Sequence, residues 1–220
     1  MVSIAIGIIG GNGAVYAFNK LPASWLCDYG KEPSEAAKSL GTQRIKSYPW
    51  KYVFTASFIV VAIYMGINDW QYAIAGIIGI WLLLEIAIAD KKYMIIPDQL
   101  VMFLAITGFG FIPFQGGFMD LVEGVILGGC VMLAVALVGK FITKKDVAGI
   151  GDVKLCAAVG LATGPYGIGF TIICGAFICG IVAAILLLMK KIKKDDEIAL
   201  GPYLCGAAII YIVILHNYFN

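Results

Sequence analysis

Two aspartates stand where the chain changes between apolar and polar sequence, and their positions would allow them to act together. Asp90 closes the apolar run 71–89, and Asp152 opens the run 153–164 directly after Gly-Ile-Gly at 149–151. Two facing carboxyl groups do not both ionise easily, so one of them keeps a proton. Such a pair can activate a water molecule with one member and protonate a peptide carbonyl with the other. The sequence therefore predicts a two-aspartate hydrolytic site at Asp90 and Asp152.

Three residues around Asp152 are candidates for supporting it. Gly149 and Gly151 are expected to permit an otherwise strained turn and to let a substrate strand lie against the backbone, so bulky replacements should fail. Lys154 is the only cation close to Asp152 in the sequence. It has two interpretations: it tunes Asp152 or grips a substrate carboxylate, or it is a structural anchor.

Other acidic residues near the pair have structural interpretations. Glu85 lies five residues before Asp90, which is about 140° round a helix, so the two do not share a face. It is expected to line a polar cavity or to pair with a lysine. Asp98 follows Ile96-Pro97 and is expected to be the N-cap of the next helix. Because a helix C-terminus disfavours an anion, Asp90 is expected to be the protonated member of the pair.

Composition places the chain in the membrane class. Of its 220 residues 61% are hydrophobic and 14% are charged, and its mean hydropathy is +0.92. Soluble domains carry roughly 25% charged residues. Six cysteines without a Cys-x-x-Cys pair and a single histidine, His216, indicate neither a disulfide framework nor a zinc site, so no metal is expected.

The apolar runs and the basic residues together predict the topology. A bilayer crossing takes about 20 helical residues, and all 16 Lys and Arg residues fall in four segments that must share the cytoplasmic side. This condition holds only if the two short runs 99–114 and 153–164 both cross. The sequence predicts an all-α, polytopic bundle of about eight helices, with both termini outside and both aspartates at the cytoplasmic face. The expected crossing runs are 2–18, 52–67, 71–89, 99–114, 121–139, 153–164, 167–189 and 198–215.

The chain is expected to divide into two parts. Residues 1–51 hold the first membrane helix and a reduced cytoplasmic loop, 19–51, which is too small for a domain core. Residues 52–220 form the expected catalytic membrane domain. The pattern Gly124-x-x-x-Gly128 has two interpretations, a face for helix association or internal packing, so the oligomeric state is not predicted.

Two longer stretches around the aspartates resemble a known family. They are DKKYMIIPDQL at 90–100 and GIGDVKL at 149–155, and with their spacing they are similar to the type IV prepilin peptidases, membrane aspartic proteases with a GxGD motif. The similarity extends to GPY at 201–203 and NKLP at 19–22. It implies cleavage of the short basic leader from prepilins or pseudopilins, usually just after a glycine, at the cytoplasmic face of a bacterial or archaeal membrane. The implied partners are these substrates and the lipid bilayer, with no nucleic acid.

The resemblance is incomplete for a second activity that many bacterial members carry. Those members also N-methylate the new terminus, using an N-terminal cytoplasmic region whose paired cysteines resemble a zinc site. Here the loop 19–51 holds only Cys27, so that metal site is expected to be absent, and with it the basis for methylation. No cofactor is expected, and S-adenosylmethionine would be required only if methyltransferase activity is retained.

Other classes of membrane protein are alternatives. A presenilin or signal-peptide-peptidase type protease shares GxGD but has a tyrosine before the first aspartate and a later Pro-Ala-Leu motif, whereas Ala89 precedes Asp90 here and no Pro-Ala-Leu follows Asp152. A small proton-coupled transporter would use Glu85 and both aspartates as a relay, with carboxylates spread through the membrane depth and inverted halves. A structural subunit of a secretion or pilus apparatus is a third alternative.

Overall fold

In the computed structural model, every regular element of the described residues is helical, as predicted. The description covers residues 2–27, 44–143, 149–193, 196 and 198–215. Within these ranges lie seven α-helices, two 3₁₀ segments and one π-helical turn. The α-helices are α1 (Val2–Lys20), α3 (Ser47–Asn68), α4 (Trp70–Tyr93), α5 (Asp98–Gly108), α6 (Phe118–Thr143), α7 (Ile150–Leu188) and α8 (Gly201–Ile210); the short elements are η1 (Ala23–Leu26), η2 (Phe109–Phe114) and η3 (Tyr211–Leu215).

Within the described part of the chain, four helices, α3, α4, α6 and α7, are long and apolar enough to cross a bilayer. A crossing takes about 20 residues, and α5 with η2 and α8 with η3 form shorter apolar helices. Helix α4 is the most enclosed, because 61% of its apolar window is buried inside the protein, against 11% to 22% for the other three. Their exposed apolar faces suit lipid better than water. The chain is therefore a multi-pass membrane protein.

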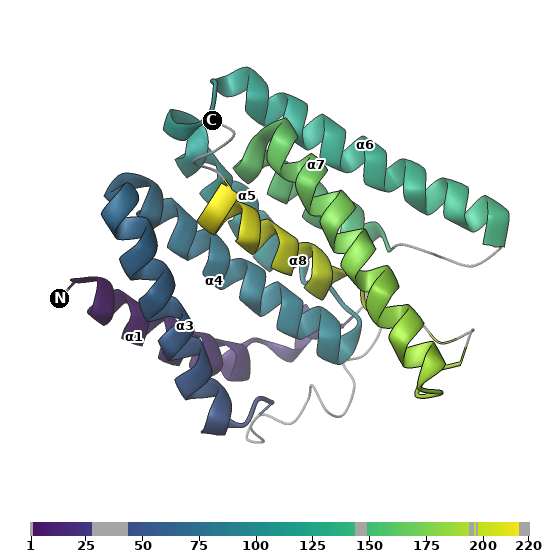
Figure 1. The fold of residues 1–220 in the computed structure, drawn as a ribbon, viewed down its shortest axis with the longest axis horizontal. Coiled ribbons are helices and arrows are strands. Elements are labelled where there is room, and N and C mark those ends of the chain that lie inside the picture. The colour runs from purple at the N-terminus through teal and green to yellow at the C-terminus, as the bar shows by residue number, and fades with distance from the viewer. Residues whose placement is uncertain (1, 28–43, 144–148, 194–195, 197, 216–220) are drawn as a thin grey trace.

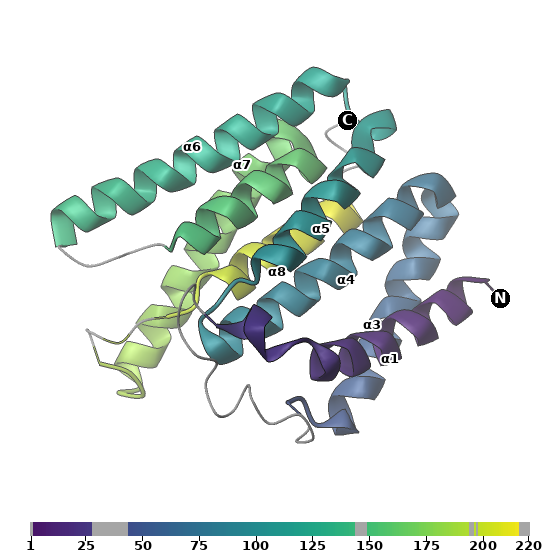
Figure 2. The ribbon, with the colours of Figure 1, turned by 180° about the vertical axis from the view of Figure 1, so that it is seen from behind.

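Helices α5 and α8 both lie between α4 and α7, on opposite faces of the bundle. Figure 1 shows α8, in yellow, between these two helices, and Figure 2 shows α5 between them from behind. Helices α1 and α3 pack on each other beside α4, and α6 packs along α7. This arrangement encloses the end of α4 and the start of α7, where the two candidate aspartates lie.

Helix α7 combines two runs that the sequence predicts as separate helices, 153–164 and 167–189. The predicted count of about eight is therefore not confirmed, since the described residues contain seven α-helices. Gly164 divides α7 into two arms, because its φ of 67° and ψ of −174° are not helical. Glycine adopts a positive φ without the steric penalty that a side chain brings. Pro165 follows and cannot donate a backbone hydrogen bond to the preceding turn.

The chain reverses direction at this break, as the two opposite views show (Figures 1 and 2). Asp152 in the first arm and Cys179 in the second are close enough to interact electrostatically. In a straight helix the 179 − 152 = 27 residues between them would span about 40 Å. Beside the break, the backbone carbonyl of Ala162 accepts a hydrogen bond from Gln115 Nε2 at 2.7 Å. The two arms of α7 therefore form a hairpin with its turn at Gly164.

Glycines bring α6 against the first arm of α7 at backbone distance. A Cβ on Gly124 would overlap the carbonyl group of Gly160, and a Cβ on Gly128 would overlap the carbonyl of Cys156. Small residues allow this close approach between membrane helices. The Gly124-x-x-x-Gly128 pattern thus serves internal packing, which is one of its two predicted interpretations.

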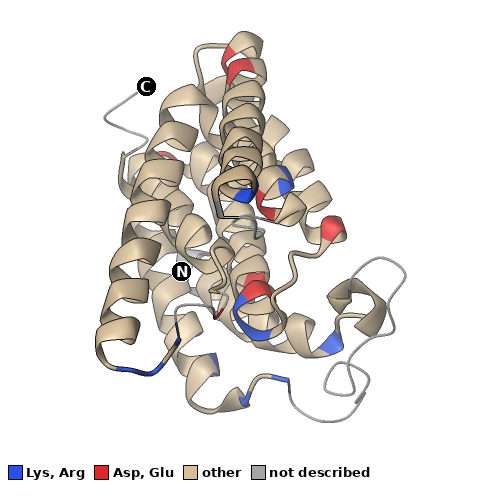
Figure 3. Ribbon diagram, turned by 90° about the vertical axis from the view of Figure 1, so that its right-hand side faces the viewer, with Lys and Arg blue, Asp and Glu red and all other residues tan. Residues whose placement is uncertain are grey.

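Charged residues gather at the helix ends and in the connections, as Figure 3 shows. Lys20 lies in the last turn of α1, two lysines end α4, and Lys140 lies in the last turn of α6. The ends of α1 and α4 are together, because the rings of Phe18 and Tyr93 stack with centroids 6.5 Å apart. The basic helix ends on α1 and α4 therefore lie side by side at the end of the bundle that carries Asp90.

The two ends of the predicted loop 19–51 are tied to this same end of the bundle. The side chain of Asn19 donates to the carbonyl of Ile45 at 3.2 Å and accepts from its N–H at 2.8 Å. Arg44 Nη1 donates to the carbonyl of Leu21 at 2.6 Å, and Lys92 Nζ donates to the carbonyl of Arg44. Residues 28–43 of the loop lie outside the described part of the chain.

Candidate active site

Asp90 is positioned by the last turns of α4 and by the start of α8. Its side chain is buried, and its Oδ2 accepts a hydrogen bond from the backbone N–H of Gly201 at 2.9 Å. Gly201 is the first residue of α8, and a Cβ there would lie 2.6 Å from Asp90 Oδ2. A side chain at position 201 would therefore force the carboxyl group of Asp90 to shift. The sequence showed Gly201 as part of GPY, but gave no sign of this contact.

Asp152 lies in the first turn of α7 and is also buried. Its Oδ2 accepts the N–H of Gly149 at 2.9 Å, as the acidic residue of a capping box does. Its Oδ1 is buried and has no hydrogen-bond partner among the described residues. The carboxyl group is thus fixed by one oxygen and leaves the other for a water molecule or a substrate.

The structure brings the two aspartates together. Their carboxyl groups are close enough to interact electrostatically, and the thiol of Cys205 in α8 lies within the same range of both. Asp90 is 7% exposed, Asp152 8% and Cys205 not at all, so the pair has restricted access to solvent. Each carboxyl group has one oxygen held by a glycine N–H that begins or precedes a helix. The prediction that Asp90 holds the proton rests on its place at a helix C-terminus. That reasoning is incomplete, because Asp90 also faces the start of α8.

The predicted strained turn before Asp152 is wrong. Gly149 has φ −76° and ψ 158°, which any residue can adopt, and the glycines with positive φ in the described chain are Gly117 and Gly164. Gly151 lies in a crowded position instead, because a Cβ there would lie 3.1 Å from Cβ of Ile96, a tight contact. At Gly149 a Cβ would make an ordinary contact of 3.6 Å with Asp152 Oδ2. The two glycines therefore have different roles, and backbone strain is neither of them.

Lys154 points to an acidic partner that the sequence did not assign to it. Its Nζ lies 2.9 Å and 2.8 Å from the two carboxylate oxygens of Asp98, and both side chains are about half exposed. Asp98 is the first residue of α5, with Pro97 in the N-cap position, so the predicted capping role is also wrong. Of the two interpretations of Lys154, the structure favours the anchor.

Glu85 is enclosed in α4 without any of its predicted partners. Its side chain is 1% exposed, and neither carboxyl oxygen has a hydrogen-bond partner among the described residues. It lies five residues before Asp90, and the hydrogen bond that holds Asp90 comes from α8 and not from Glu85. A buried polar group without a partner destabilises the fold.

We expect Glu85→Met to raise the free energy of unfolding by about 1–3 kcal/mol, because it replaces two unpartnered oxygens with apolar atoms of similar reach. Thermal unfolding of the purified protein in detergent would measure this gain. The exposed Glu123 offers a matched control, since Glu123→Met should change the free energy of unfolding by less than about 0.5 kcal/mol. A loss of stability in Glu85→Met would show that the carboxyl group has a stabilising partner.

Gly201→Ala is expected to lower the turnover rate of the two-aspartate hydrolysis that the sequence predicts by roughly 10- to 100-fold, because its Cβ would displace the carboxyl group of Asp90. Gly206 lies on the same helix and has open space around its Cβ position, so Gly206→Ala should leave the rate unchanged. Comparing the two variants in one cleavage assay checks the contact. Equal rates would mean that Asp90 does not depend on Gly201.

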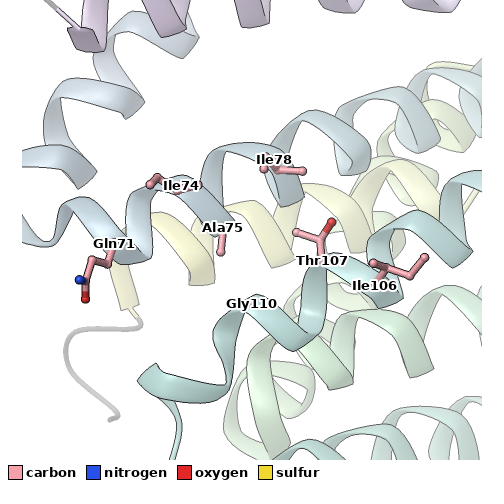
Figure 4. A pocket seen from close by; sticks show the side chains of 7 residues that line it. All are labelled: Gln71, Ile74, Ala75, Ile78, Ile106, Thr107 and Gly110. Carbon is pink, nitrogen blue, oxygen red and sulfur yellow. The ribbon is translucent and has the colours of Figure 1, made fainter.

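A surface groove lies away from the aspartates. It has a volume of about 340 Å³ and lies between the first half of α4 and the end of α5 with η2, as Figure 4 shows. Its lining includes Gln71 and Ile78 on α4 and Thr107 on α5. Twelve residues of α4, about 18 Å, separate Ile78 from Asp90. Among the described residues no group of three or more His, Cys, Asp or Glu side chains is placed to hold a metal ion.

The fold and the buried aspartate pair define a multi-pass helical membrane protein with a two-carboxyl site. The model of the type IV leader peptidase family matches residues 77–188, a segment that includes both aspartates. This match covers half of the chain. The chain belongs to the type IV leader peptidase family, as the sequence motifs predict.

Curated relatives are also named as leader peptidases. The chain is 29% identical to the prepilin leader peptidase/N-methyltransferase of Aeromonas hydrophila over 166 residues, which cover 74% of this chain and 57% of the relative. It is 30% identical to the Pseudomonas aeruginosa protein of that name over 170 residues, or 75% of this chain and 57% of the relative. The matched part thus spans a little over half the length of these relatives. No solved structure matches the chain.

Proposed function

We propose that this protein is a membrane aspartic endopeptidase that removes the short basic leader from prepilins or pseudopilins. The observation that carries the proposal is the buried pair Asp90 and Asp152, held by backbone N–H groups within electrostatic range of each other. The family match and the names of the curated relatives support the same activity. They favour it over a presenilin-type protease, a transporter and a structural subunit.

In the proposed reaction the two carboxyl groups share one proton and hold a water molecule between them. The ionised member removes a proton from the water, and the oxygen of the water attacks the carbonyl carbon of the scissile peptide bond. The protonated member gives its proton to the carbonyl oxygen. The tetrahedral diol then collapses, the C–N bond breaks, and the leaving nitrogen takes a proton from the pair. The free Oδ1 of Asp152 faces this water in our proposal.

The proposed orientation puts this site at the cytoplasmic face, with both termini outside. Its support is the set of basic helix ends beside Asp90, because Lys and Arg are retained on the cytoplasmic side. At the opposite end of α4, the hydroxyl of Tyr72 donates to the carbonyl of Ile212 at 3.1 Å. The last described turn, η3, therefore lies at the end away from the aspartates. Both arms of α7 would cross under this orientation, which gives the eight crossings of the sequence prediction.

The proposal is limited to the peptidase. The relatives' names also include N-methyltransferase, an activity whose methyl donor would be S-adenosylmethionine. In the described part of the loop 19–51 the thiol of Cys27 donates to the carbonyl of Ser24 at 3.2 Å, and no metal-binding cluster accompanies it there. No step through that cofactor follows from these residues.

Co-expression with a prepilin tests the proposed function. The substrate should carry a short basic leader, a glycine before the cut and an apolar segment after it, and electrophoresis should show the mature form only when this chain is present. The mass of the mature N-terminus shows whether it is methylated, because a methyl group adds a fixed increment to that mass. An uncleaved leader, with the enzyme folded in the membrane, would contradict the proposal. A methylated terminus would overturn its limitation to the peptidase.

A further inference from the structure

The segment that follows α4 returns to touch the first turn of α7 at two points. Ile96 packs against Gly151, where a Cβ would approach the Ile96 side chain to 3.1 Å. Two residues further on, Asp98 holds Lys154 through both carboxylate oxygens, at 2.9 Å and 2.8 Å. These contacts lie one residue before and two residues after Asp152. The segment itself begins a few residues after Asp90.

We propose that Ile96–Asp98 acts as a positioning clamp, which sets the first turn of α7, and with it Asp152, at the correct distance from Asp90. This inference rests on the proposed peptidase function. It assigns Asp98 and Lys154 to the geometry of the site, so they are positioning residues that do not contact the substrate. The Asp98–Lys154 ion pair and the Ile96–Gly151 contact act together as its two points of attachment.

The solvent exposure of the Asp98–Lys154 ion pair favours a positioning role over a stabilising one. Both side chains are about half exposed, and ion pairs of this kind contribute little to folding stability because solvent screens them. The bidentate geometry nevertheless fixes the start of α5 relative to α7. Catalytic groups tolerate little displacement, so a small shift of Asp152 would lower the rate far more than it would lower the stability.

The packing beyond the pair keeps the clamp rigid. Helix α5 runs parallel to the first arm of α7, because Asp98 meets Lys154 at one end and Gly108 lies against Leu161 at the other. A Cβ on Gly108 would overlap the Leu161 side chain. The two helices are therefore in close contact over their shared length. The clamp is the end of this contact that lies beside the aspartates.

A double-mutant cycle tests the clamp with a purified prepilin substrate. Asp98→Asn and Lys154→Gln should each lower kcat by roughly tenfold. The kcat of the double variant should be no lower than that of the less active single variant, because the two residues act as one unit. KM should remain within about twofold of the wild-type value, since uniform substrate binding is not affected. Lys154→Arg, which keeps the charge and can bind a carboxylate bidentately, should retain most of the activity.

Two outcomes would overturn the clamp while leaving the peptidase intact. If Lys154→Gln raises KM and leaves kcat unchanged, Lys154 binds the substrate instead. If the two single effects multiply in the double variant, the residues act independently. Thermal unfolding should be nearly unchanged in every variant, so a loss of folded protein would also count against a positioning role. Failure of the wild-type chain to cleave would contradict the proposed function itself.

The second point of attachment gives an independent test. Gly151→Ala should lower kcat with little change in KM, because the new Cβ would push the first turn of α7 away from Ile96. Gly169 has open space around its Cβ position on the second arm of α7, so Gly169→Ala should leave kcat unchanged. Equal kcat values for the two variants would show that the Ile96 contact does not position Asp152.

Discussion

Asp90→Asn and Asp152→Asn are each expected to lower the rate of leader cleavage by roughly 10²- to 10⁴-fold, the range for loss of a general acid or base. Asparagine has nearly the same shape as aspartate, and its amide oxygen can still accept the backbone N–H that each Oδ2 accepts now. The fold and the position of the side chain should therefore persist. The amide cannot exchange a proton with water or with the peptide carbonyl, so the loss would be chemical.

The double variant and one control variant sharpen this test. Asp90→Asn with Asp152→Asn should be no slower than the worse single variant, because groups that act as one unit do not lose activity additively. Asp69 accepts the N–H groups of Gln71 and Tyr72 at 2.8 Å and 3.2 Å as the N-cap of α4. Since asparagine caps as well as aspartate, Asp69→Asn should cleave normally. Normal cleavage by either single catalytic variant would refute the aspartic mechanism.

The sequence was sufficient to predict that the two aspartates lie together, for a physical reason. Ionisable groups inside membrane helices are costly and seldom occur without a function, so few carboxyl groups had to be considered. Asp90 and Asp152 were predicted to share one face from the distribution of the basic residues, and the structure brings the two together. The helical class followed from the same apolar runs, because lipid leaves backbone polar groups no partners outside a helix or a closed barrel.

Contacts between distant segments could not be read from the sequence. The N–H of Gly201 reaches Asp90 across 111 positions, and Lys154 reaches Asp98 across 56. Such pairs depend on how α8 and α5 lie between α4 and α7, which hydropathy does not determine. The reversal near Gly164 differs from these contacts, because the sequence predicts the runs 153–164 and 167–189 as separate crossing helices, which requires a turn between them. Hydropathy does not show that a glycine with positive φ makes this turn within one long helical element.

The glycines around the site show a further limit. A Gly-x-Gly sequence before an aspartate predicts a strained turn, yet Gly149 has ordinary angles and Gly151 lies in a crowded position beside Ile96. Both uses of glycine look alike in a sequence. They differ in consequence, because a strained position rejects every side chain, whereas a crowded one rejects side chains only in proportion to their volume.

The glycine contact between α6 and α7 is expected to produce the largest effect on stability. Gly124→Ala places a methyl group on the carbonyl of Gly160, which belongs to a rigid backbone and cannot turn away. Overpacking of this kind destabilises a fold by about 1–3 kcal/mol, and the combined change Gly124→Ala with Gly128→Ala should exceed either single change. Gly128 meets the carbonyl of Cys156, one turn after Asp152. Cleavage should therefore fall together with stability.

Gly129 is a matched control for the effect of a glycine-to-alanine change on stability. It lies on the same helix, beside Gly128, but is less crowded. A Cβ there would be 3.8 Å from Cβ of Ala157, an ordinary contact. Within a helix alanine is favoured over glycine by about 1 kcal/mol, so Gly129→Ala should be neutral or stabilising while Gly124→Ala is destabilising. Thermal unfolding in detergent, with the folded yield from size-exclusion chromatography, would measure both. Equal midpoints would mean that α6 can move away from α7 at little cost.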